Sequence, residues 1–192
     1  KITMANFWST TDVEPKRNFR FQVQITGLSG GEDVLWWAKT VTTPSYDVAE
    51  VEHNHLDNKY YFPGRVSWNE ISMTLVDPIS IDAVKLTNDL VIKSGYLVPA
   101  GAPTTDTTRA TISKKKAVAA MGGSTGIIIT VLSADGKPIE VWTLGNPFIK
   151  SAKYGDLDYS SDDLRTVELS LRYDWAVCDT GGNNGTTQFK PQ

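Results

Sequence analysis

The sequence predicts a mainly β protein, an antiparallel β-sandwich or partial barrel with one packed α-helix. Residues 166–177 alternate apolar and polar side chains, and residues 19–26 do the same. This alternation is typical of a strand with one buried face and one face in water. Helical periodicity follows only Asp77-Pro78. Many strands with one buried and one solvent-exposed face, together with a single helix, indicate a sandwich or barrel that the helix covers on one side.

Composition limits the possible classes of protein. The 192 residues fit one domain with arms, and 40% hydrophobic residues are enough for a core. A net charge of −3, from 22 acidic and 19 basic side chains, argues against a protein dedicated to gripping DNA. The single cysteine, Cys178, excludes an internal disulfide and fits a reducing compartment. We expect no membrane span and no signal peptide, because no long apolar run is present.

The chain is expected to have three parts. Residues 1–18 form an N-terminal arm, residues 19–178 the β domain, and residues 179–192 a flexible tail rich in Gly, Asn and Thr. The arm contains Phe7 and Trp8, and these large aromatic side chains favour docking on the body or a neighbour over simple fraying.

The first half of the β domain contains three predicted strands, at residues 19–26, 34–42 and 66–76. Glycines separate the first two, and Pro44 ends the second. Between the second and third strands, residues 46–64 form a mostly polar loop that is too long for a tight turn.

A helix is predicted over about residues 78–94, with Asp77 as N-cap and Gly95 as the C-terminal stop. Its apolar arc is wider than contact with one sheet requires, so we expect cover from the chain's own loops or from another subunit. Residues 99–126 follow the helix. They are rich in Pro, Gly, Ala and Thr, so we predict a flexible insertion there.

The second half is again predicted to be extended. Residues 126–132 and 139–144 form a hairpin around Asp135-Gly136, a strong turn signal. A further extended piece over residues 148–157 leads through a turn into the final alternating strand.

One candidate metal site is visible in the sequence. His53, His55 and Asp57 have the spacing of ligands on one strand face. They lie in a polar loop, and no fourth ligand is evident. We therefore favour solvated or interface residues and expect no metal.

Other candidate sites are weaker. Asp162 and Asp163 are adjacent in a turn and point apart, and Cys178 has no histidine partner by motif. Lys114–Lys116 could touch phosphate, although a solvated or salt-bridging loop is the favoured interpretation. Neither a phosphate-binding loop nor a dinucleotide-binding glycine pattern is present. We expect no enzyme activity and no cofactor.

Four stretches of the sequence resemble one known family. They are residues 19–28 (FRFQVQITGL), 37–44 (WAKTVTTP), 62–78 (FPGRVSWNEISMTLVDP) and 144–176, which contains LGNP, YGDLDY and LRYDW. These strings, in this order, resemble the tail-tube proteins of contractile-tailed (T4-like) bacteriophages. The insertion after the helix and the tail after Trp175 are longer than the family pattern, which leaves a baseplate-proximal tube protein open as an alternative.

The resemblance implies a structural function. Such proteins form stacked hexameric rings, and the resulting tube lies inside a contractile sheath. The implied partners are further copies of the chain, the sheath, baseplate and tape-measure proteins, and DNA that crosses the lumen without sequence-specific binding. The implied location is the tail of a virion assembled in the host cytoplasm. Alternatives are a tube initiator, the inner tube of a related injection machine such as the type VI secretion system, or a small β-barrel module that binds a ligand or nucleic acid.

Two sets of residues are assigned to assembly on this basis. Polar residues of the barrel strands are expected to line the lumen, the candidates being Gln22, Gln24, Glu168, Arg172 and Asp174. The long loop between two strands combines apolar side chains with charges of both signs, so we predict that it reaches an adjacent ring rather than folding back on its own subunit. The candidates for this contact are Tyr46, Val48, Glu50, Val51, His53, His55, Leu56 and Tyr60.

Overall fold

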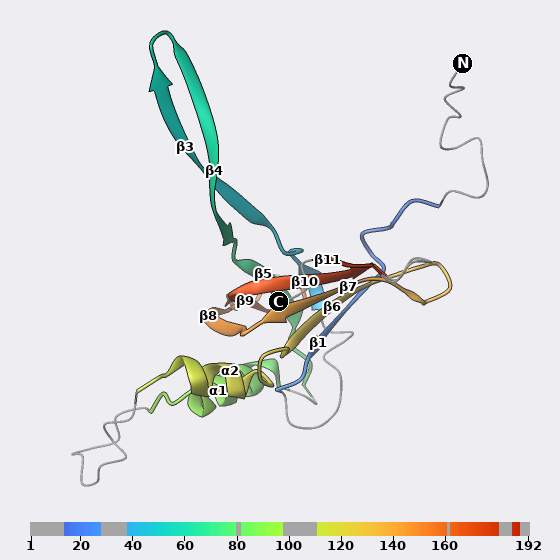
Figure 1. Ribbon diagram of the computed structural model, residues 1–192. Helices are drawn as coiled ribbons and strands as arrows, with labels where there is room; N and C mark the ends of the chain where they lie inside the picture. Colours follow the sequence, from blue (N-terminus) through green and yellow to red (C-terminus); the bar gives the residue numbers. More distant parts are fainter. Residues whose placement is uncertain are drawn as a thin grey trace.

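The computed structural model describes residues 14–27, 38–79, 82–97, 111–160, 162–180 and 186–188. Two antiparallel sheets lie at the centre, two helices lie on one side of them, and a long hairpin projects on the other side (Figure 1). The mainly β fold class is therefore confirmed, with a second helix that the sequence did not predict. Several predicted segments lie partly outside the described residues: 1–13 of the arm, 34–37 of the second strand, 99–110 of the insertion, and 181–185 and 189–192 of the tail.

Sheet A has five strands, all antiparallel to their neighbours. In spatial order they are β1 (Phe21–Ile25), β6 (Ile127–Leu132), β7 (Pro138–Gly145), β10 (Trp175–Thr180) and β11 (Thr186–Gln188). β6 and β7 form the predicted hairpin, and Gly136 occupies its turn with φ of 73°, a conformation that glycine adopts without a steric cost. β11 pairs with β10, so part of the predicted flexible tail extends the sheet instead.

Sheet B has four strands. In spatial order they are β2 (Ala38–Val41), β5 (Ile71–Val76), β9 (Thr166–Arg172) and β8 (Phe148–Tyr154). All the pairs are antiparallel. β2 and β8 are consequently the two open edges of this sheet.

Both sheets contribute one face to a single core. Sheet A buries Val23, Ile129 and Leu144, and sheet B buries Met73 and Leu171. The alternation predicted for residues 166–172 is confirmed, because the apolar parity is buried and the other parity is half-buried or exposed. Burial of each large aliphatic side chain contributes about 1.5–3 kcal/mol, so this shared core holds the two sheets together.

The long final strand predicted over residues 166–177 is wrong as a single element. The chain leaves sheet B after Arg172 and enters sheet A at Trp175. Tyr173 is buried but Ala176 is the next buried residue, so the buried parity changes at the crossing. The sequence hides this change because Trp175 is apolar and continues the earlier alternation.

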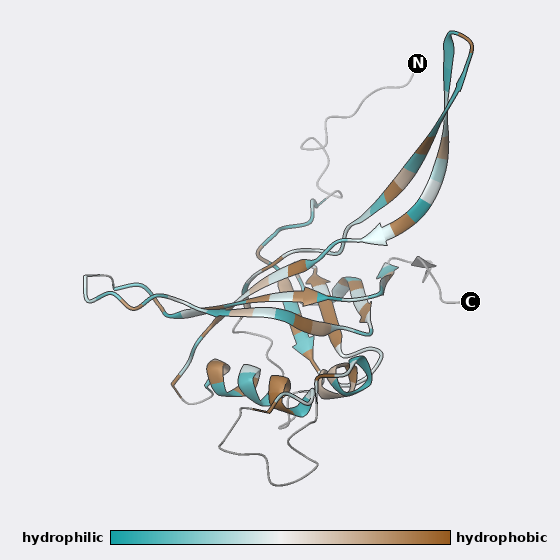
Figure 2. Ribbon diagram, turned by 90° about the vertical axis from the view of Figure 1, so that its left-hand side faces the viewer, coloured by the Kyte–Doolittle hydropathy of each residue, from teal (hydrophilic) through white to brown (hydrophobic). Residues whose placement is uncertain are grey.

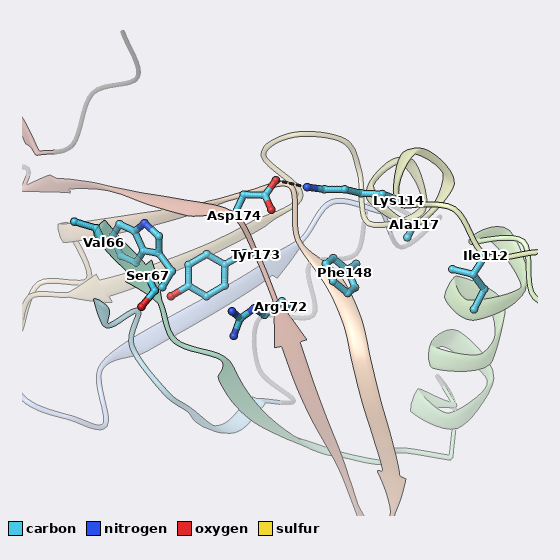
Figure 3. Close-up of a pocket in the computed structure, with 10 residues that line it drawn as sticks. Val66, Ser67, Ile112, Lys114, Ala117, Phe148, Arg172, Tyr173 and Asp174 are labelled. Atoms are coloured by element: carbon cyan, nitrogen blue, oxygen red, sulfur yellow. Dashed lines mark hydrogen bonds and ion pairs between the residues drawn. The ribbon is translucent and has the colours of Figure 1, made fainter. Parts of the chain in front are cut away.

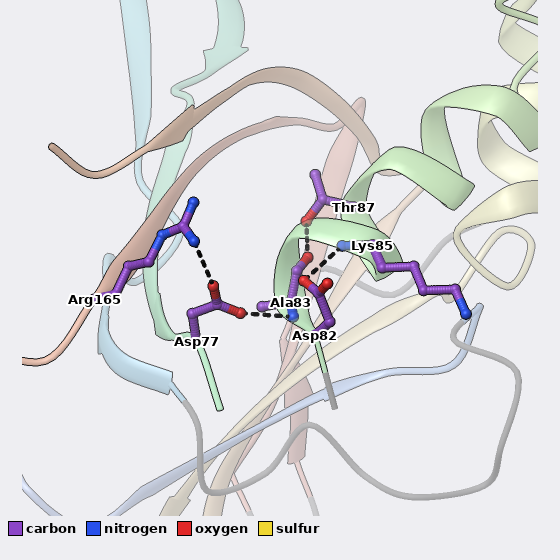
Figure 4. Close-up of polar contacts among 6 residues, drawn as sticks. All are labelled: Asp77, Asp82, Ala83, Lys85, Thr87 and Arg165. Atoms are coloured by element: carbon purple, nitrogen blue, oxygen red, sulfur yellow. Dashed lines mark hydrogen bonds and ion pairs between the residues drawn. The ribbon is translucent and has the colours of Figure 1, made fainter. Parts of the chain in front are cut away.

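The predicted helix is shorter than expected. α1 spans Ala83–Lys93, and its N-cap is Asp82, whose Oδ1 accepts a hydrogen bond from the Lys85 backbone N at 3.0 Å (Figure 4). Asp77, the expected cap, instead accepts from the backbone N of Ala83 at 2.9 Å and lies 3.7 Å from Arg165. Two carboxylates thus stabilise the amino end of α1, where the helix leaves N–H groups unpaired.

A second helix lies within the predicted flexible insertion. α2 spans Lys114–Ala120 and is capped by Ser113, whose hydroxyl accepts from the Lys116 backbone N. Its buried Ala120, together with Met121, joins the core beside Leu90 of α1. The helix is too short to show an amphipathic repeat, so the sequence pattern of this segment predicts a loop.

The long loop predicted between two strands is itself a pair of strands. β3 (Tyr46–His55) and β4 (Asn58–Trp68) form a separate two-stranded sheet. Within the described part of the chain, the two strands pair only with each other, and the ribbon projects away from the sandwich (Figure 1).

Candidate functional site

The projecting hairpin is the most unusual surface of the described chain. Every residue of β3 and every residue of β4 before Trp68 is exposed, although many of them are aliphatic or aromatic. Figure 2 shows hydrophobic and hydrophilic residues interspersed along the ribbon. A two-stranded ribbon in water is only marginally stable. Apolar side chains on such a ribbon indicate a surface that another molecule covers.

The two faces of the hairpin differ. Cross-strand partners lie on the same face. Val51, His53 and His55 therefore share one face with their partners Phe62, Tyr60 and Asn58. The opposite face carries Glu50, Glu52 and Lys59, and Lys59 pairs with Glu52 at 3.0 Å. One face is thus aromatic with two histidines, and the other is charged.

The tip and the middle of the hairpin have special backbone features. Leu56 occupies the two-residue turn with φ of 52° and is 89% exposed. A bulky residue in the left-handed region costs about 1 kcal/mol, so its presence at the tip indicates a use for the apolar side chain. Lower down, a Cβ at Gly64 would lie 2.9 Å from the Ala49 carbonyl oxygen, so the irregular pairing there requires glycine.

Three aromatic rings fix the foot of the hairpin to the body. The rings of Tyr46 and Trp68 are 5.3 Å apart, and the rings of Trp68 and Tyr173 are 5.9 Å apart. Tyr173 lies where the chain crosses from β9 to β10. The hairpin is therefore tied to the point at which the two sheets are joined.

A cavity of about 550 Å³ lies beside this foot (Figure 3). Its lining comes from the hairpin, α2, β8 and the β9–β10 crossing: Val66, Ser67, Trp68, Ile112, Lys114, Ala117, Phe148, Arg172, Tyr173 and Asp174. Lys114 donates to Asp174 at 2.6 Å, and Asn146 donates to the same carboxylate oxygen at 3.0 Å. These contacts lower the pKa of Asp174, with the Lys114 hydrogen bond as the main cause.

The chemistry of this cavity suits the seating of a side chain rather than a reaction. Burial raises the pKa of Tyr173, although the nearby Ser45 backbone opposes the rise. Its hydroxyl has no partner within hydrogen-bond geometry in the described part of the chain. The charged groups that line the cavity are ion-paired: Lys114 with Asp174, and Arg172 with Glu70 at 3.6 Å. An apolar pocket with a paired rim offers no activated nucleophile.

The structure divides the five lumen candidates between different surfaces. Gln22 and Gln24 lie on β1 in sheet A, whereas Glu168 and Arg172 lie on β9 in sheet B. Because both sheets turn their apolar parity toward the shared core, these two pairs face away from each other. Asp174 lies between β9 and β10, where its carboxylate is paired with Lys114. The assignment to a lumen stays a prediction, and at most one of the two pairs can line it.

The outer faces of the two sheets also differ in composition. In sheet B this face carries mostly hydroxyl groups and charges, with two apolar side chains: Thr40, Ser72, Thr74, Val76, Phe148, Ser151, Lys153, Thr166, Glu168, Ser170 and Arg172. In sheet A it mixes polar and apolar side chains: Gln22, Gln24, Ile128, Thr130, Val141, Thr143, Val177 and Asp179. Sheet B thus presents the more hydrophilic wall, whereas the outer face of sheet A needs partial cover.

The weak chemical candidates do not assemble into a site. The described residues include no group of three histidine, cysteine or carboxylate side chains arranged to hold a metal ion. Cys178 is buried, and burial together with nearby Glu140 raises the pKa of its thiol, which keeps it in the unreactive protonated form. Lys114, Lys115 and Lys116 form the exposed first turn of α2. Neither helix in the described part of the chain combines the length and apolar character that crossing a bilayer requires.

Comparison with known proteins identifies the fold. No protein-family model matches the sequence, and no curated protein matches it. Among solved structures, the tube-terminating cap of the anti-feeding prophage covers 94% of this chain and 99% of its own, with 15% identity and a TM-score of 0.63. The sheath/tube terminator of the extracellular contractile injection system PVC covers 88% and 99%, with 15% identity and a TM-score of 0.61. The PVC sheath-tube complex contains a chain that covers 86% and 92%, with 17% identity and a TM-score of 0.57. The chain therefore has the fold of contractile tail-tube and cap proteins, as its resemblance to phage tail tubes implied.

Proposed function

We propose that this chain is a structural subunit of the tube of a contractile injection machine, and that copies of it form hexameric rings that stack. The observation that carries the proposal is the hairpin, which exposes apolar side chains on a ribbon with no third strand in the described chain. A body with this fold needs contacts between copies to form a tube, and the hairpin provides a surface that the described part of its own chain leaves uncovered. A tube-terminating subunit at the baseplate or cap end is the alternative, supported by the cap and terminator likenesses.

The hairpin is proposed to make the contact between rings. It projects well beyond the sandwich (Figure 1), and its aromatic face, Val51, Tyr60 and Phe62 with the two histidines, would lie against the adjacent ring. The charged face supplies Glu50, Glu52 and Lys59, which would fix the register of the contact.

The outer face of sheet B is proposed to line the lumen. Its serines and threonines are hydrophilic without strong charge, and its charges are mixed, since Lys153 lies opposite Glu168 and Arg172 lies 3.6 Å from Glu70. A wall of this kind would let DNA or another polyanion pass, because few unpaired cations are available to bind phosphate. If six copies each contribute the four strands of sheet B, a barrel of about 24 strands would enclose a lumen about 40 Å wide.

Shortening the hairpin tests the ring-to-ring contact. Because Glu50 pairs with Pro63, residues 51–62 can be replaced by Asn-Gly without changing the register of the remaining strands. We expect a folded protein, by circular dichroism, that forms single rings or monomers but no long tubes in negative-stain images. A matched control replaces residues 133–137, which connect the paired residues Leu132 and Pro138 of the β6–β7 hairpin, by Asn-Gly and should leave tubes intact. Normal tubes from the shortened β3–β4 hairpin would refute the proposal.

Labelling tests which sheet lines the lumen. In a Cys178→Ser background, Ser72→Cys places a thiol on the outer face of sheet B, and Gln24→Cys places one on that of sheet A. A maleimide-linked gold cluster at residue 72 should appear at the centre of end-on rings, and one at residue 24 should appear in the wall. Gold at the centre from residue 24 would reverse the assignment of the two sheets.

A further inference from the structure

A basic groove opens between the edges of the two sheets, at β1 and β2. Its volume is about 530 Å³. Phe21, Val41, Ile129 and Val131 form its apolar floor, where the core of the sandwich reaches the surface. A groove with such a floor is an incomplete edge of the sandwich, and another apolar segment would complete it.

The rim of this groove is strongly positive. It carries Lys16, Arg17, Arg20 and Lys39 and no carboxylate. Lys16 pairs with Glu140, and Arg20 pairs with Glu14 at 2.8 Å. Arg17 and Lys39 are exposed, and neither has a carboxylate partner among the described residues. The groove therefore offers two uncompensated positive charges above an apolar floor.

The loop between β8 and β9 has the complementary composition. Residues 155–165 contain four aspartates: Asp156, Asp158, Asp162 and Asp163. Three apolar side chains of the same loop project into solvent: Leu157 is 81% exposed, Tyr159 is 112% exposed and Leu164 is 73% exposed. Its one basic residue, Arg165, lies 3.7 Å from Asp77 and so is already paired.

The base of this loop is held in a defined shape. The Gly155 backbone N donates to the Thr166 carbonyl at 3.0 Å, which continues the β8–β9 pairing. Ser160 donates to Asp158 from both its backbone N and its hydroxyl, at 2.9 and 2.8 Å. These bonds lower the pKa of Asp158, so the loop keeps its negative charge down to more acidic pH.

We propose that the acidic β8–β9 loop of one copy docks into the basic β1–β2 groove of the next copy around the ring. This contact deepens the proposed function and rests on it. β2 and β8 are the opposite edges of sheet B, so the groove and the loop lie on opposite sides of the subunit. A head-to-tail contact between two different surfaces repeats from copy to copy and closes into a ring when the rotation fits.

The charges indicate which groups meet in this contact. Arg17 and Lys39 would face Asp156 and Asp162, which likewise have no cationic partner among the described residues. The exposed Leu157 and Tyr159 would cover the floor formed by Phe21 and Val41. Complementary charge fixes the orientation of the contact, and apolar burial supplies most of its strength.

Charge reversal tests the contact. The groove variant carries Arg17→Glu and Lys39→Glu, and the loop variant carries Asp156→Lys and Asp162→Lys. All four positions are exposed, so folding should be unchanged by circular dichroism and thermal melting. Each variant alone should need at least a tenfold higher concentration than the wild type to form rings, measured by sedimentation velocity and negative stain. A variant with Lys85→Glu and Lys115→Glu, on the exposed sides of α1 and α2, has the same net charge as the groove variant and should assemble normally.

Restoration is the decisive result. Each two-site variant offers the surface that the other lacks, so an equimolar mixture should form rings in which the two alternate. A single chain carrying all four substitutions has the wild-type net charge and should also assemble. If both two-site variants assemble like the wild type, or if neither combination restores rings, the contact is wrong.

Further outcomes distinguish this contact from two alternatives. In one, a different segment occupies the groove; in the other, the protein forms no rings. If deletion of residues 1–13 reproduces the defect of the groove variant while the loop variant assembles normally, the groove holds the N-terminal arm and the proposed contact is overturned. A wild-type chain that stays monomeric at every concentration would overturn the proposed function together with this contact. Wild-type rings that are unaffected by the loop variant would overturn the contact alone.

Discussion

The sandwich body and the β3–β4 hairpin are built from similar side chains but use them in opposite ways. The body buries its aliphatic residues between two sheets, with Ile71, Met73, Leu144 and Leu171 all at most 1% exposed. The hairpin exposes Val51, Phe62 and their neighbours to solvent along its length. The body can therefore fold on its own core, whereas the hairpin has apolar area that the rest of the described chain leaves exposed. Mutations in the two regions should separate stability from assembly.

The largest effect on stability is expected in the body. Leu171→Ala removes a side chain that is fully buried at the centre of β9 and leaves a cavity in the shared core. The free energy of unfolding should fall by about 2–5 kcal/mol, measured by urea denaturation. Val66→Ala, in the exposed hairpin, is the matched truncation and should change it by less than about 0.5 kcal/mol. Similar losses from the two variants would mean that the hairpin is part of the body's folding unit.

The second effect concerns the start of α1. Asp82→Ala removes the side-chain acceptor of the Lys85 backbone N–H and should cost about 1 kcal/mol by thermal or chemical denaturation. Asp47→Ala makes the same change at an exposed position of the hairpin, and we expect no measurable loss there. An equal loss from both would show that surface charge, rather than capping, determines the effect.

The third effect depends on pH and concerns Asp174, beside the foot of the hairpin. The Lys114 hydrogen bond is the main cause that lowers the pKa of Asp174 in the folded protein. The ionised carboxylate therefore stabilises the folded state fully above the unfolded pKa of about 3.9. This stabilisation is lost as pH falls through the lower pKa of the folded state. Asp174→Asn should therefore reduce stability at pH 7 by less than about 1 kcal/mol, because the pair is partly exposed. The difference from wild type should shrink when urea midpoints are compared at pH 7 and pH 3. A difference that stays constant with pH would rule out this ion pair as the cause.

The smallest effect on stability, with the clearest effect on assembly, is expected in the hairpin. Phe62→Ser removes an exposed ring from the aromatic face, so the free energy of unfolding should change by less than about 0.5 kcal/mol. Tubes in negative-stain images should nevertheless become shorter and fewer. Tyr96→Ser, which removes an exposed ring outside the hairpin, is the control and should leave tubes normal. If both variants make normal tubes, the aromatic face is not the contact between rings.

Much of the fold could be predicted because local patterns determine it. Alternation predicted β1 and β9, and the Asp135-Gly136 turn predicted the β6–β7 hairpin. The strand predicted over residues 66–76 is wrong as a single element, because residues 66–68 end β4 and Ile71–Val76 form β5 in another sheet. The presence of a helix after β5 was also confirmed, although its first turn begins at Asp82 rather than Asp77 because both aspartates precede it and both bond to it.

The arrangement of sheets could not be predicted, because it depends on long-range pairing. Nothing near Tyr173 signals that the chain changes sheets there, since apolar alternation continues through Trp175. The same limitation placed Gln22 and Glu168 in one set of lumen candidates, although their strands belong to different sheets. The alternation along a strand predicts which of its residues share a face. Only the hydrogen-bonded pairing of the strands determines which sheet that face belongs to.

The sequence predicts the hairpin as an assembly segment, which stays a prediction, but does not predict its two strands. Its charged and amide side chains suppress the usual apolar signal, and Pro63-Gly64 interrupts it in the middle of β4. In the structure this interruption is accommodated by the irregular pairing beside Ala49. The residues chosen for the contact, including His53 and Tyr60, do share one ribbon, and their part in a ring-to-ring contact stays a prediction.

The three aromatic rings in contact at the foot of the hairpin also affect how force enters the subunit. A pull along the hairpin passes through the backbone to β2 and β5, and the contacts of Tyr46 and Trp68 carry part of it to Tyr173, at the crossing between β9 and β10. From there it divides between two strands that lie in different sheets, each hydrogen-bonded to a neighbour on both sides. To detach, such a strand must break many bonds together in shear rather than one after another, so the hairpin is anchored at a mechanically resistant place in the molecule.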